Sequence, residues 1–311
     1  MDISIRIETA EQLDPVLTSS LARQAFQKDG PELSAERFAW SYRRGYERAT
    51  IVSAFADDAK VGQLVCFFKS FFIGGQEHTA AEFVDLFVSP DFRGFKVASS
   101  LYKEMHNVVT NEGADILFAY ANEGASVLNR RFFGMEEVTQ LPGRAGIIVP
   151  FAAARSAAKI TVHRKAEDIA ATCADCAGSG NLGGVELTEE ELLRRIGSPV
   201  QQYLCATDGN TAILASPRII RTVPLLLICA TFSRRGATPD RRTIGAMIES
   251  LCRAAGRKAF LYVGWNDAVG RSNGFAIAER LLKGKFLIQS NCLNSRRDAI
   301  GRFEILDVDY G

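Results

Sequence analysis

The sequence predicts an α/β protein of the mixed-sheet type, with two similar domains in tandem. Short runs of alternating apolar and polar residues are followed by amphipathic stretches, which is typical of a mixed sheet covered by helices. The pattern of the first 150 residues returns in the same order in the rest of the chain. A length of 311 residues suits two domains of roughly 150 residues each.

The first half opens with a strand and an amphipathic helix in "IRIETAEQLDPVLTSSLARQAF", where Thr9 and Gln12 form a capping box. A second helix follows in "SAERFAWSYRR". "SAFADDAKVGQLVCFFKSFFIGG" predicts two antiparallel strands that turn at Asp57 and Asp58, and "EFVDLFV" predicts a further strand. A helix after Arg93, a buried strand before Asn122, another helix and the strand "AGIIV" complete the half.

The second half repeats this plan. "ITVHRKAEDIAATCADC" matches the opening strand and helix, and "TEEELLRRI", with a capping box at Thr188, matches the second helix. "FLYVGWNDAV" around Asn266 resembles "ILFAYANEGA" around Asn122. Patterning weakens over residues 149–159, so we place the two domains at residues 1–150 and 151–311.

Composition excludes several classes of protein. Hydrophobic residues make up 47% and charged residues 23%, enough for packed cores and atypical of a disordered chain. A net charge of +1 does not favour a nucleic-acid partner. The longest apolar run, "VPLLLICATF", has about half the length of a membrane-spanning helix, and the N-terminus lacks the pattern of a signal peptide. We therefore expect a cytoplasmic protein without a membrane partner.

The seven cysteines predict buried thiols, because their number is odd and their surroundings are apolar. Only "CADC", at Cys173 and Cys176, has metal-like spacing. No second ligand pair follows it, so we expect no metal.

The turn "SPDFRGFKVASSL" after the strand "EFVDLFV" predicts an anion-binding site. A helix that starts directly after a strand presents unpaired N–H groups and the positive end of its dipole. Gly94 allows a tight turn, and the small residues Ala98 and Ser99 allow close approach. Arg93 and Lys96 add positive charge. These features suit a phosphate or pyrophosphate.

This stretch resembles the central motif of the GNAT superfamily, the acetyl-CoA-dependent N-acetyltransferases. In that family an Arg/Gln-x-x-Gly-x-Gly/Ala loop binds the pyrophosphate of CoA. Arg93 fills the first position and Ala98 the last, whereas Lys96 replaces the middle glycine and could either help bind the phosphates or narrow the site. The paired strands before the motif and the Asn122 turn after it also resemble the family, so the likeness covers almost all of residues 1–150.

The resemblance implies that acetyl-CoA or another acyl-CoA binds the first half. It assigns the strand edge, the loop, the first helical turn and the asparagine turn to this role: Phe87, Val88, Arg93, Gly94, Phe95, Lys96, Val97, Ala98, Ser99 and Asn122.

The resemblance also implies acid–base chemistry. Glu82 lies where family members that use a glutamate base carry it. Asp85 is on the same strand and, by strict alternation, faces the other side, unless a bulge reverses the two acids. The family's usual acid, a tyrosine, is replaced by Arg130, and Tyr120 is a substitute candidate.

The second half lacks this motif. After "VPLLLICATF" the loop becomes "SRRGATPDRRTIGAMIESL", and the glycine run "GSGNLGG" is expected to be a loop because no strand precedes it. We therefore expect a degenerate GNAT-like domain that has lost cofactor binding and shapes the acceptor pocket. Aromatic candidates for that pocket are Trp40, Tyr42, Tyr46 and Trp265.

The expected function is transfer of an acyl group from CoA to a primary amine of a small molecule, by direct attack rather than through an acyl-enzyme. The alternatives are a CoA-binding or acyl-CoA-sensing module without turnover, and a structural protein that binds no CoA. The acceptor remains open among amino sugars, amino acids, polyamines, antibiotics and peptides. Amino sugar nucleotides are slightly favoured because a two-lobed pocket suits a bulky substrate. The oligomeric state is expected to be monomer or homodimer.

Overall fold

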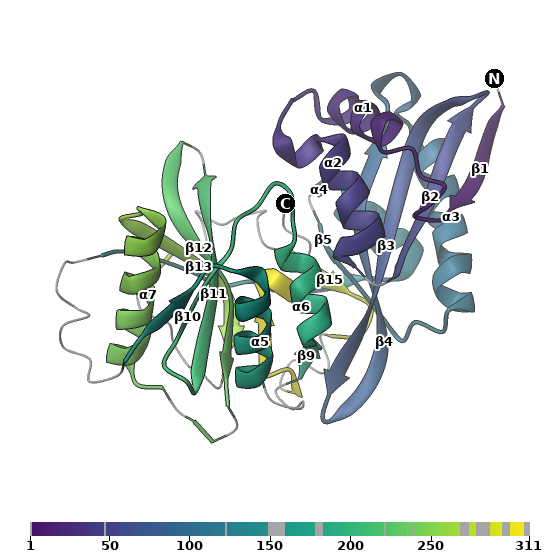
Figure 1. The fold of residues 1–311 in the computed structure, drawn as a ribbon. Helices are drawn as coiled ribbons and strands as arrows, with labels where there is room; N and C mark the ends of the chain where they lie inside the picture. The colour runs from purple at the N-terminus through teal and green to yellow at the C-terminus, as the bar shows by residue number, and fades with distance from the viewer. Residues whose placement is uncertain are drawn as a thin grey trace.

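The computed structural model describes residues 2–46, 48–121, 123–148, 159–177, 183–220, 222–234, 236–237, 239–267, 274–277, 287–293 and 299–307. It contains two mixed sheets in two lobes, with helices packed against each sheet (Figure 1). The predicted fold class is confirmed: the protein is α/β, and its two mixed sheets are consistent with tandem GNAT-like domains.

The sheet of the first lobe is formed mainly by the first half of the chain. Its strands follow one another in chain order: β1 (Ile3–Glu8), β2 (Arg48–Ala56), β3 (Ala59–Ile73), β4 (Gln76–Val88) and β5 (Ile116–Tyr120). Neighbours from β1 to β4 are antiparallel, whereas β4 and β5 are parallel. A parallel pair requires a long crossover, and here that crossover contains a helix.

Helices cover both faces of this sheet. One face packs against α1 (Pro15–Phe26) and α2 (Ala35–Trp40), which continues into a π-helical turn (Ser41–Gly45). The other face packs against α3 (Phe95–Asn111) and α4 (Glu123–Phe133).

The start of α1 differs from the prediction. Thr9 and Gln12 do form the reciprocal contacts of a capping box, at 3.0 and 3.4 Å. The helix nevertheless begins later, after Asp14, whose carboxylate accepts hydrogen bonds from two backbone N–H groups of the first turn. Pro15 favours this start because its fixed φ suits the first helical position.

Gly62 in β3 brings α3 close to the sheet. A Cβ atom at this position would lie 3.0 Å from Val97 Cγ1 and 3.2 Å from Leu101 Cδ1. Glycine therefore allows the first turns of α3 to pack directly on the strand, which fixes where the loop before α3 lies.

The second lobe repeats the arrangement. Its strands are β8 (Thr161–His163), β10 (Leu204–Thr207), β11 (Thr211–Ile220), β12 (Val223–Ser233) and β13 (Ala259–Asn266). Its helices are α5 (Ala166–Ala177), α6 (Glu189–Ile196) and α7 (Arg241–Ala255). The capping box predicted at Thr188 is confirmed, with Glu191 as its partner.

The two sheets exchange one strand each. β15 (Leu287–Ser290) comes from the second half of the chain but lies in the first sheet, between β5 and β6 (Glu136–Gln140). β7 (Gly143–Ile147) comes from the first half but lies in the second sheet, between β13 and β14 (Phe275–Ala276). The domain boundary at residue 150 stays a prediction, and the exchange was not foreseen.

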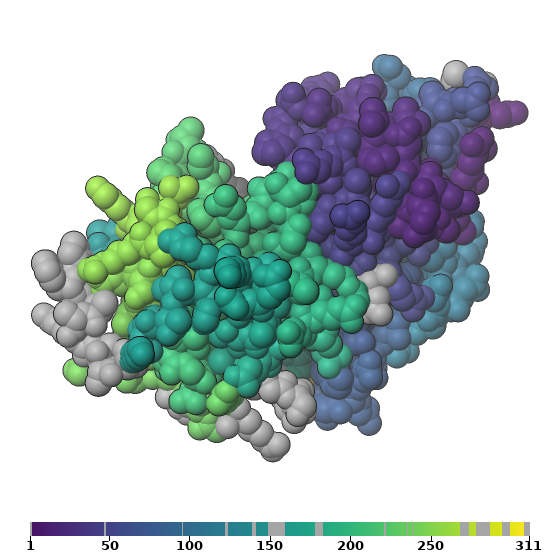
Figure 2. Space-filling view, in the orientation of Figure 1, coloured from purple at the N-terminus to yellow at the C-terminus, as the bar shows by residue number. Residues whose placement is uncertain are grey.

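A short strand also links the lobes. β9 (Gly184–Val185) pairs with Phe71 and Phe72 of β3. It follows the glycine run, of which residues 178–182 lie outside the described part of the chain. Figure 2 shows the two lobes in broad contact, with teal and green atoms of the second lobe against blue and purple atoms of the first.

The cysteines are unpaired thiols, and Cys173 and Cys176 are buried on α5, as predicted. Within the described ranges, no group of three or more His, Cys, Asp or Glu side chains is placed to hold a metal ion. No helix in the same ranges has the length and apolar character needed to cross a membrane.

Candidate active site

The candidate site lies where β4 and β5 separate. The two strands pair from Ala80 to Phe83 of β4, and beyond Phe83 no further pairing between them is found in the described residues. At the same place β4 has a bulge, because Asp85 and Leu86 together lie opposite one residue of β3. Asp85 adopts a left-handed φ of 51°, which aspartate tolerates better than most residues. After the bulge, the described part of β4 therefore has no pairing with β5.

A cavity of about 580 Å³ occupies this divergence and is called the β4–β5 cavity below. It lies between β4, β5, the end of α1 and the first turns of α3 and α4. Seven residues predicted to act in catalysis or cofactor binding line it: Asp85, Phe87, Val88, Arg93, Gly94, Ala98 and Tyr120. The volume is in the range of small-molecule sites.

The loop before α3 closes one end of the cavity. Arg93 is exposed, lines the cavity and donates a hydrogen bond to the carbonyl of Ala25 at the end of α1. α3 begins at Phe95, and its N-cap residue Gly94 supplies no side-chain hydrogen bond. The first N–H groups of α3 are thus left uncapped by a side chain, as an anion site requires.

Other predicted cofactor residues do not line the cavity. Lys96 is exposed, so its side chain does not narrow the cavity. Val97 is buried against Gly62, and the Ser99 hydroxyl donates to the Lys96 carbonyl at 3.2 Å. Asn122 and the side chain of Phe95 lie outside the described part of the chain.

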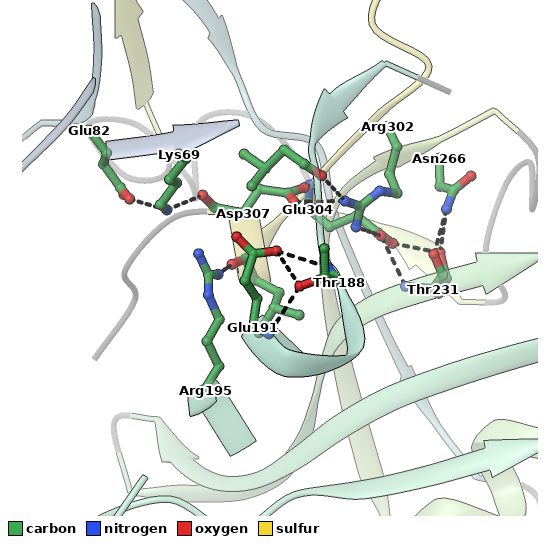
Figure 3. A network of polar contacts seen from close by, with 12 residues as sticks. Lys69, Glu82, Thr188, Glu191, Arg195, Thr231, Asn266, Arg302, Glu304 and Asp307 are labelled. Atoms are coloured by element: carbon green, nitrogen blue, oxygen red, sulfur yellow. Dashed lines mark hydrogen bonds and ion pairs between the residues drawn. The ribbon is translucent and has the colours of Figure 1, made fainter. Parts of the chain in front are cut away.

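Glu82 lies in a buried ion pair. Its carboxylate accepts a hydrogen bond from Lys69 Nζ, and the two side chains are 0% and 3% exposed (Figure 3). Lys69 Nζ also donates to the carbonyl of Asp307 at 2.8 Å. Glu82 therefore touches a lysine that the C-terminal segment holds in place, and it is not among the residues lining the β4–β5 cavity.

Asp85 has different partners. Its carboxylate accepts hydrogen bonds from Arg37 Nη1 at 2.8 Å and from the Tyr42 hydroxyl at 2.6 Å. Tyr42 in turn accepts from Gln63 Nε2 at 3.0 Å. Both acids lie on the α1–α2 face, because the bulge interrupts the alternation of β4. The prediction of opposite faces from strict alternation is wrong, and the bulge considered as its alternative is present.

Three further polar residues near the cavity were missed. Tyr102 of α3 lines the cavity and donates to Asn129 Oδ1 at 2.7 Å, and burial raises the pKa of its phenol. Asn129 donates to Gln289 Oε1 at 3.0 Å. Gln289 belongs to the exchanged strand β15, so no local pattern in the first half could reveal this contact.

A second, smaller cavity lies between the lobes and is called the inter-lobe cavity below. Trp40 and Tyr46, two of the aromatic candidates for the acceptor pocket, line it. Tyr42 and Trp265 do not: Tyr42 is buried in the core, and Trp265 stacks on Phe303 at 5.5 Å between ring centroids.

The second lobe has no matching open divergence among its described residues. β12 and β13 pair only from Leu226 to Ile228, and beyond that β16 (Arg302–Glu304) pairs with β13. Glu304 accepts hydrogen bonds from the backbone N–H and hydroxyl of Thr231, at 2.9 and 2.6 Å (Figure 3). The C-terminal segment thus lies at the place that is a cavity in the first lobe. The loss of cofactor binding in the second lobe stays a prediction.

A family model described as an acetyltransferase (GNAT) domain matches residues 5–134. These residues belong to the GNAT acetyltransferase family. The matched range includes β4, the loop at Arg93, α3 and β5, which together form most of the β4–β5 cavity. No curated protein matches the chain in sequence.

Solved structures extend the likeness to both lobes. A probable N-acyltransferase of unknown function from Enterococcus faecalis V583 is 12% identical with a TM-score of 0.65, over 93% of this chain and 72% of that one. A GCN5-related N-acetyltransferase from Kribbella flavida is 16% identical with a TM-score of 0.64, over 94% and 72%. A tandem GNAT protein from the clavulanic acid biosynthesis pathway is 9% identical with a TM-score of 0.55, over 93% and 98%. The GNAT likeness of the fold therefore includes the second lobe.

Proposed function

We propose that the protein transfers an acyl group from acetyl-CoA, or another acyl-CoA, to a primary amine of a small molecule. The observation that carries the proposal is the open divergence of β4 and β5 beside the uncapped start of α3, within a GNAT acetyltransferase domain. The second lobe, whose corresponding divergence is filled by β16, then serves as the wall of the acceptor pocket.

The cofactor would lie along three parts of the cavity. Its pyrophosphate would bind the first N–H groups of α3, with Arg93 supplying positive charge and Ala98 leaving room. Its pantetheine arm would pair with the free backbone of β4 near Phe87 and Val88. This places the thioester between β4 and β5.

The reaction needs a base for the amine, and we propose Glu82. It lies on β4 one residue before pairing with β5 ends, at the position where the resemblance puts a glutamate base. Asp85 is the second candidate because it lines the β4–β5 cavity itself. Tyr120, which also lines the cavity, is proposed to protonate the departing thiolate.

Paired substitutions test the assignment. Glu82→Gln and Asp85→Asn are each titrated with acetyl-CoA by calorimetry and assayed for acyl transfer to a panel of amines. We expect Glu82→Gln to lower kcat with an unchanged Kd for acetyl-CoA. Equal activity of this variant and wild type across pH would remove Glu82 as the base, and loss only in Asp85→Asn would transfer the role to Asp85.

The same titration tests the alternative of a CoA-binding module without turnover. Two features favour that alternative: Lys96 replaces a motif glycine, and Arg130 stands at the usual tyrosine position with an exposed side chain. Tight binding of acetyl-CoA without transfer to any amine would support it. Absence of binding by the folded protein would leave only a structural role.

A further inference from the structure

We propose that the amine acceptor carries a carboxylate and that Arg37, Arg195 and Arg218 bind this carboxylate in the inter-lobe cavity. The proposal rests on the proposed acyl transfer and names the class of its acceptor. It begins from the charge of a cavity that the family likeness does not describe.

The inter-lobe cavity is small and is lined by residues of both lobes. Its volume of about 40 Å³ has room for about three waters or one small polar group. Aromatic and aliphatic side chains form much of its wall: Trp40, Tyr46, Val200, Tyr203, Leu227, Cys229, Ile305 and Leu306. A nucleotide would not fit into this volume, so the cavity does not support an amino sugar nucleotide as acceptor.

Three guanidinium groups reach the cavity from separate elements: Arg37 from α2, Arg195 from α6 and Arg218 from β11. The acidic residue in the lining is Glu32, and Lys28 pairs with it at 3.0 Å. The charge of Arg37 is balanced by Asp85. The positive charge that remains in the lining belongs to Arg195 and Arg218. Such a site favours an anion that is small enough to enter.

The partners of the three arginines differ. Arg37 and Arg195 are 5% and 6% exposed and already bind protein groups, Asp85 and the Leu306 carbonyl respectively. Arg218 is different: its Nε atom is buried and has no hydrogen-bond partner among the described residues. The Arg218 guanidinium, which lines the cavity, therefore keeps hydrogen-bonding capacity that a carboxylate in the cavity can use.

Arg37 also connects this cavity to the reaction. Its side chain lines the inter-lobe cavity and donates at 2.8 Å to Asp85, which lines the β4–β5 cavity. The Arg37–Asp85 ion pair thus contacts both cavities. An acceptor whose carboxylate lies at Arg218 and Arg195 can extend its amine past Arg37 toward the thioester. Guanidinium groups match the flat, two-oxygen geometry of a carboxylate, which is why we choose it over other anions.

The test compares amines in matched pairs. The common amino acids, β-alanine and γ-aminobutyrate are each assayed with acetyl-CoA beside the corresponding amide, which keeps the amine and removes the charge. We expect wild type to prefer at least one carboxylate over its amide by about tenfold or more in kcat/KM, the size of one charge-assisted hydrogen bond. Amides used as well as the acids would overturn the proposal.

Variants locate the effect. Arg218→Gln is expected to raise KM for the preferred carboxylate by about tenfold, with its KM for the amide unchanged, and Arg218→Lys should recover part of the loss. The control Arg253→Gln removes an arginine that is 61% exposed in the same lobe and should change neither. An unchanged preference in Arg218→Gln, at unaltered Tm and acetyl-CoA affinity, would overturn the assignment.

Failure of the proposed function gives a different result. If acetyl-CoA binds but no amine is acylated, the acyl-transfer proposal fails. Calorimetric titration with the same acids and amides then still tests the carboxylate site. The anion site would be supported if wild type binds a carboxylate probe but not its amide, and if Arg218→Gln does not bind the carboxylate. Equal or absent binding of acid and amide would refute it.

Discussion

Lys69 and Glu82 form an ion pair in the first lobe that a residue near the end of the described chain also contacts. Glu82 lies on β4 and Lys69 on β3, but the lysine is also bound by the carbonyl of Asp307 from the C-terminal segment. Two charges removed from water stabilise each other only while both are present. The candidate base is therefore positioned by the second lobe as well as by its own sheet.

Lys69→Met is expected to lower the free energy of unfolding by about 3–5 kcal/mol, because it removes the ammonium that pairs with the buried Glu82 carboxylate. Urea denaturation measures the change. Arg48→Met is the control, since its partner Glu112 is 41% exposed and such pairs contribute about 0–1 kcal/mol. Losses of the same size in both variants would contradict a special role for the buried pair.

Glu304 predicts a pH dependence of stability. Burial raises its pKa to about 7 from the usual 4.5, despite the nearby Arg302 and the hydrogen bonds from Thr231. Between these two values the folded protein binds more protons at Glu304 than the unfolded chain. The contribution of Glu304 to stability therefore falls as pH rises from about 4.5 to about 7 and is constant above that.

Glu304→Gln should remove this fall. Relative to wild type, the free energy of unfolding of the variant should rise by roughly 3 kcal/mol between about pH 4 and about pH 8. Urea titrations of both proteins across this range measure it. A constant difference between variant and wild type would show that Glu304 does not titrate in the folded protein as proposed.

At the scale of elements, the close packing of β16 on β13 requires a glycine in β13. Gly264 of β13 has a φ of 130°, and a Cβ atom there would lie 2.7 Å from Glu304 Cα and overlap the Phe303 carbonyl. Gly264→Ala should therefore loosen β16 and lower the free energy of unfolding by at least about 2 kcal/mol. Faster hydrogen exchange at residues 302–304 would locate the effect.

Gly209→Ala provides the control for this prediction. Gly209 has a φ of 93°, but a Cβ atom there would meet nothing within 4 Å. Gly209→Ala should therefore lower the free energy of unfolding by about 1 kcal/mol through backbone strain alone. Hydrogen exchange in β16 should stay unchanged. Equal effects of the two substitutions would mean that the contact with β16 is unimportant.

The elements differ in how far the sequence could predict them. The Thr188 capping box and the turn between Asp57 and Asp58 depend on neighbouring residues, and the structure has both. The strand exchange depends on pairing between segments more than a hundred residues apart, and one apolar strand edge looks like another in sequence. Arg93 could be found from its motif. The place of Arg218 in a cavity between the lobes could not, because residues of both lobes form that cavity.

At the scale of the whole molecule, the exchange makes each lobe dependent on the other. Without residues 151–311, the first sheet loses β15, which lies between β5 and β6. β5 then pairs only with β4, and β6 is separated from the sheet. Gln289, which binds Asn129 and Ser126, is lost with β15. The separate halves are then expected to expose unpaired strand edges.

Residues 1–150 expressed alone should therefore not give a folded monomer that binds acetyl-CoA. Gel filtration and circular dichroism, followed by titration with acetyl-CoA, measure this. Mixing in a separately expressed second half should restore binding if the exchange is the cause. A stable first half with full affinity for acetyl-CoA would contradict the dependence.

The position of β15 in the chain also determines when the site can form during synthesis. The ribosome delivers residues 287–290 more than a hundred residues after β5 and β6. Until then the first sheet has a gap between these strands, open to pairing with other nascent chains. Folding of the candidate site is thus delayed until β15 has been synthesised, and chaperones that shield strand edges should affect the yield of this protein more than that of a GNAT domain whose strands are contiguous.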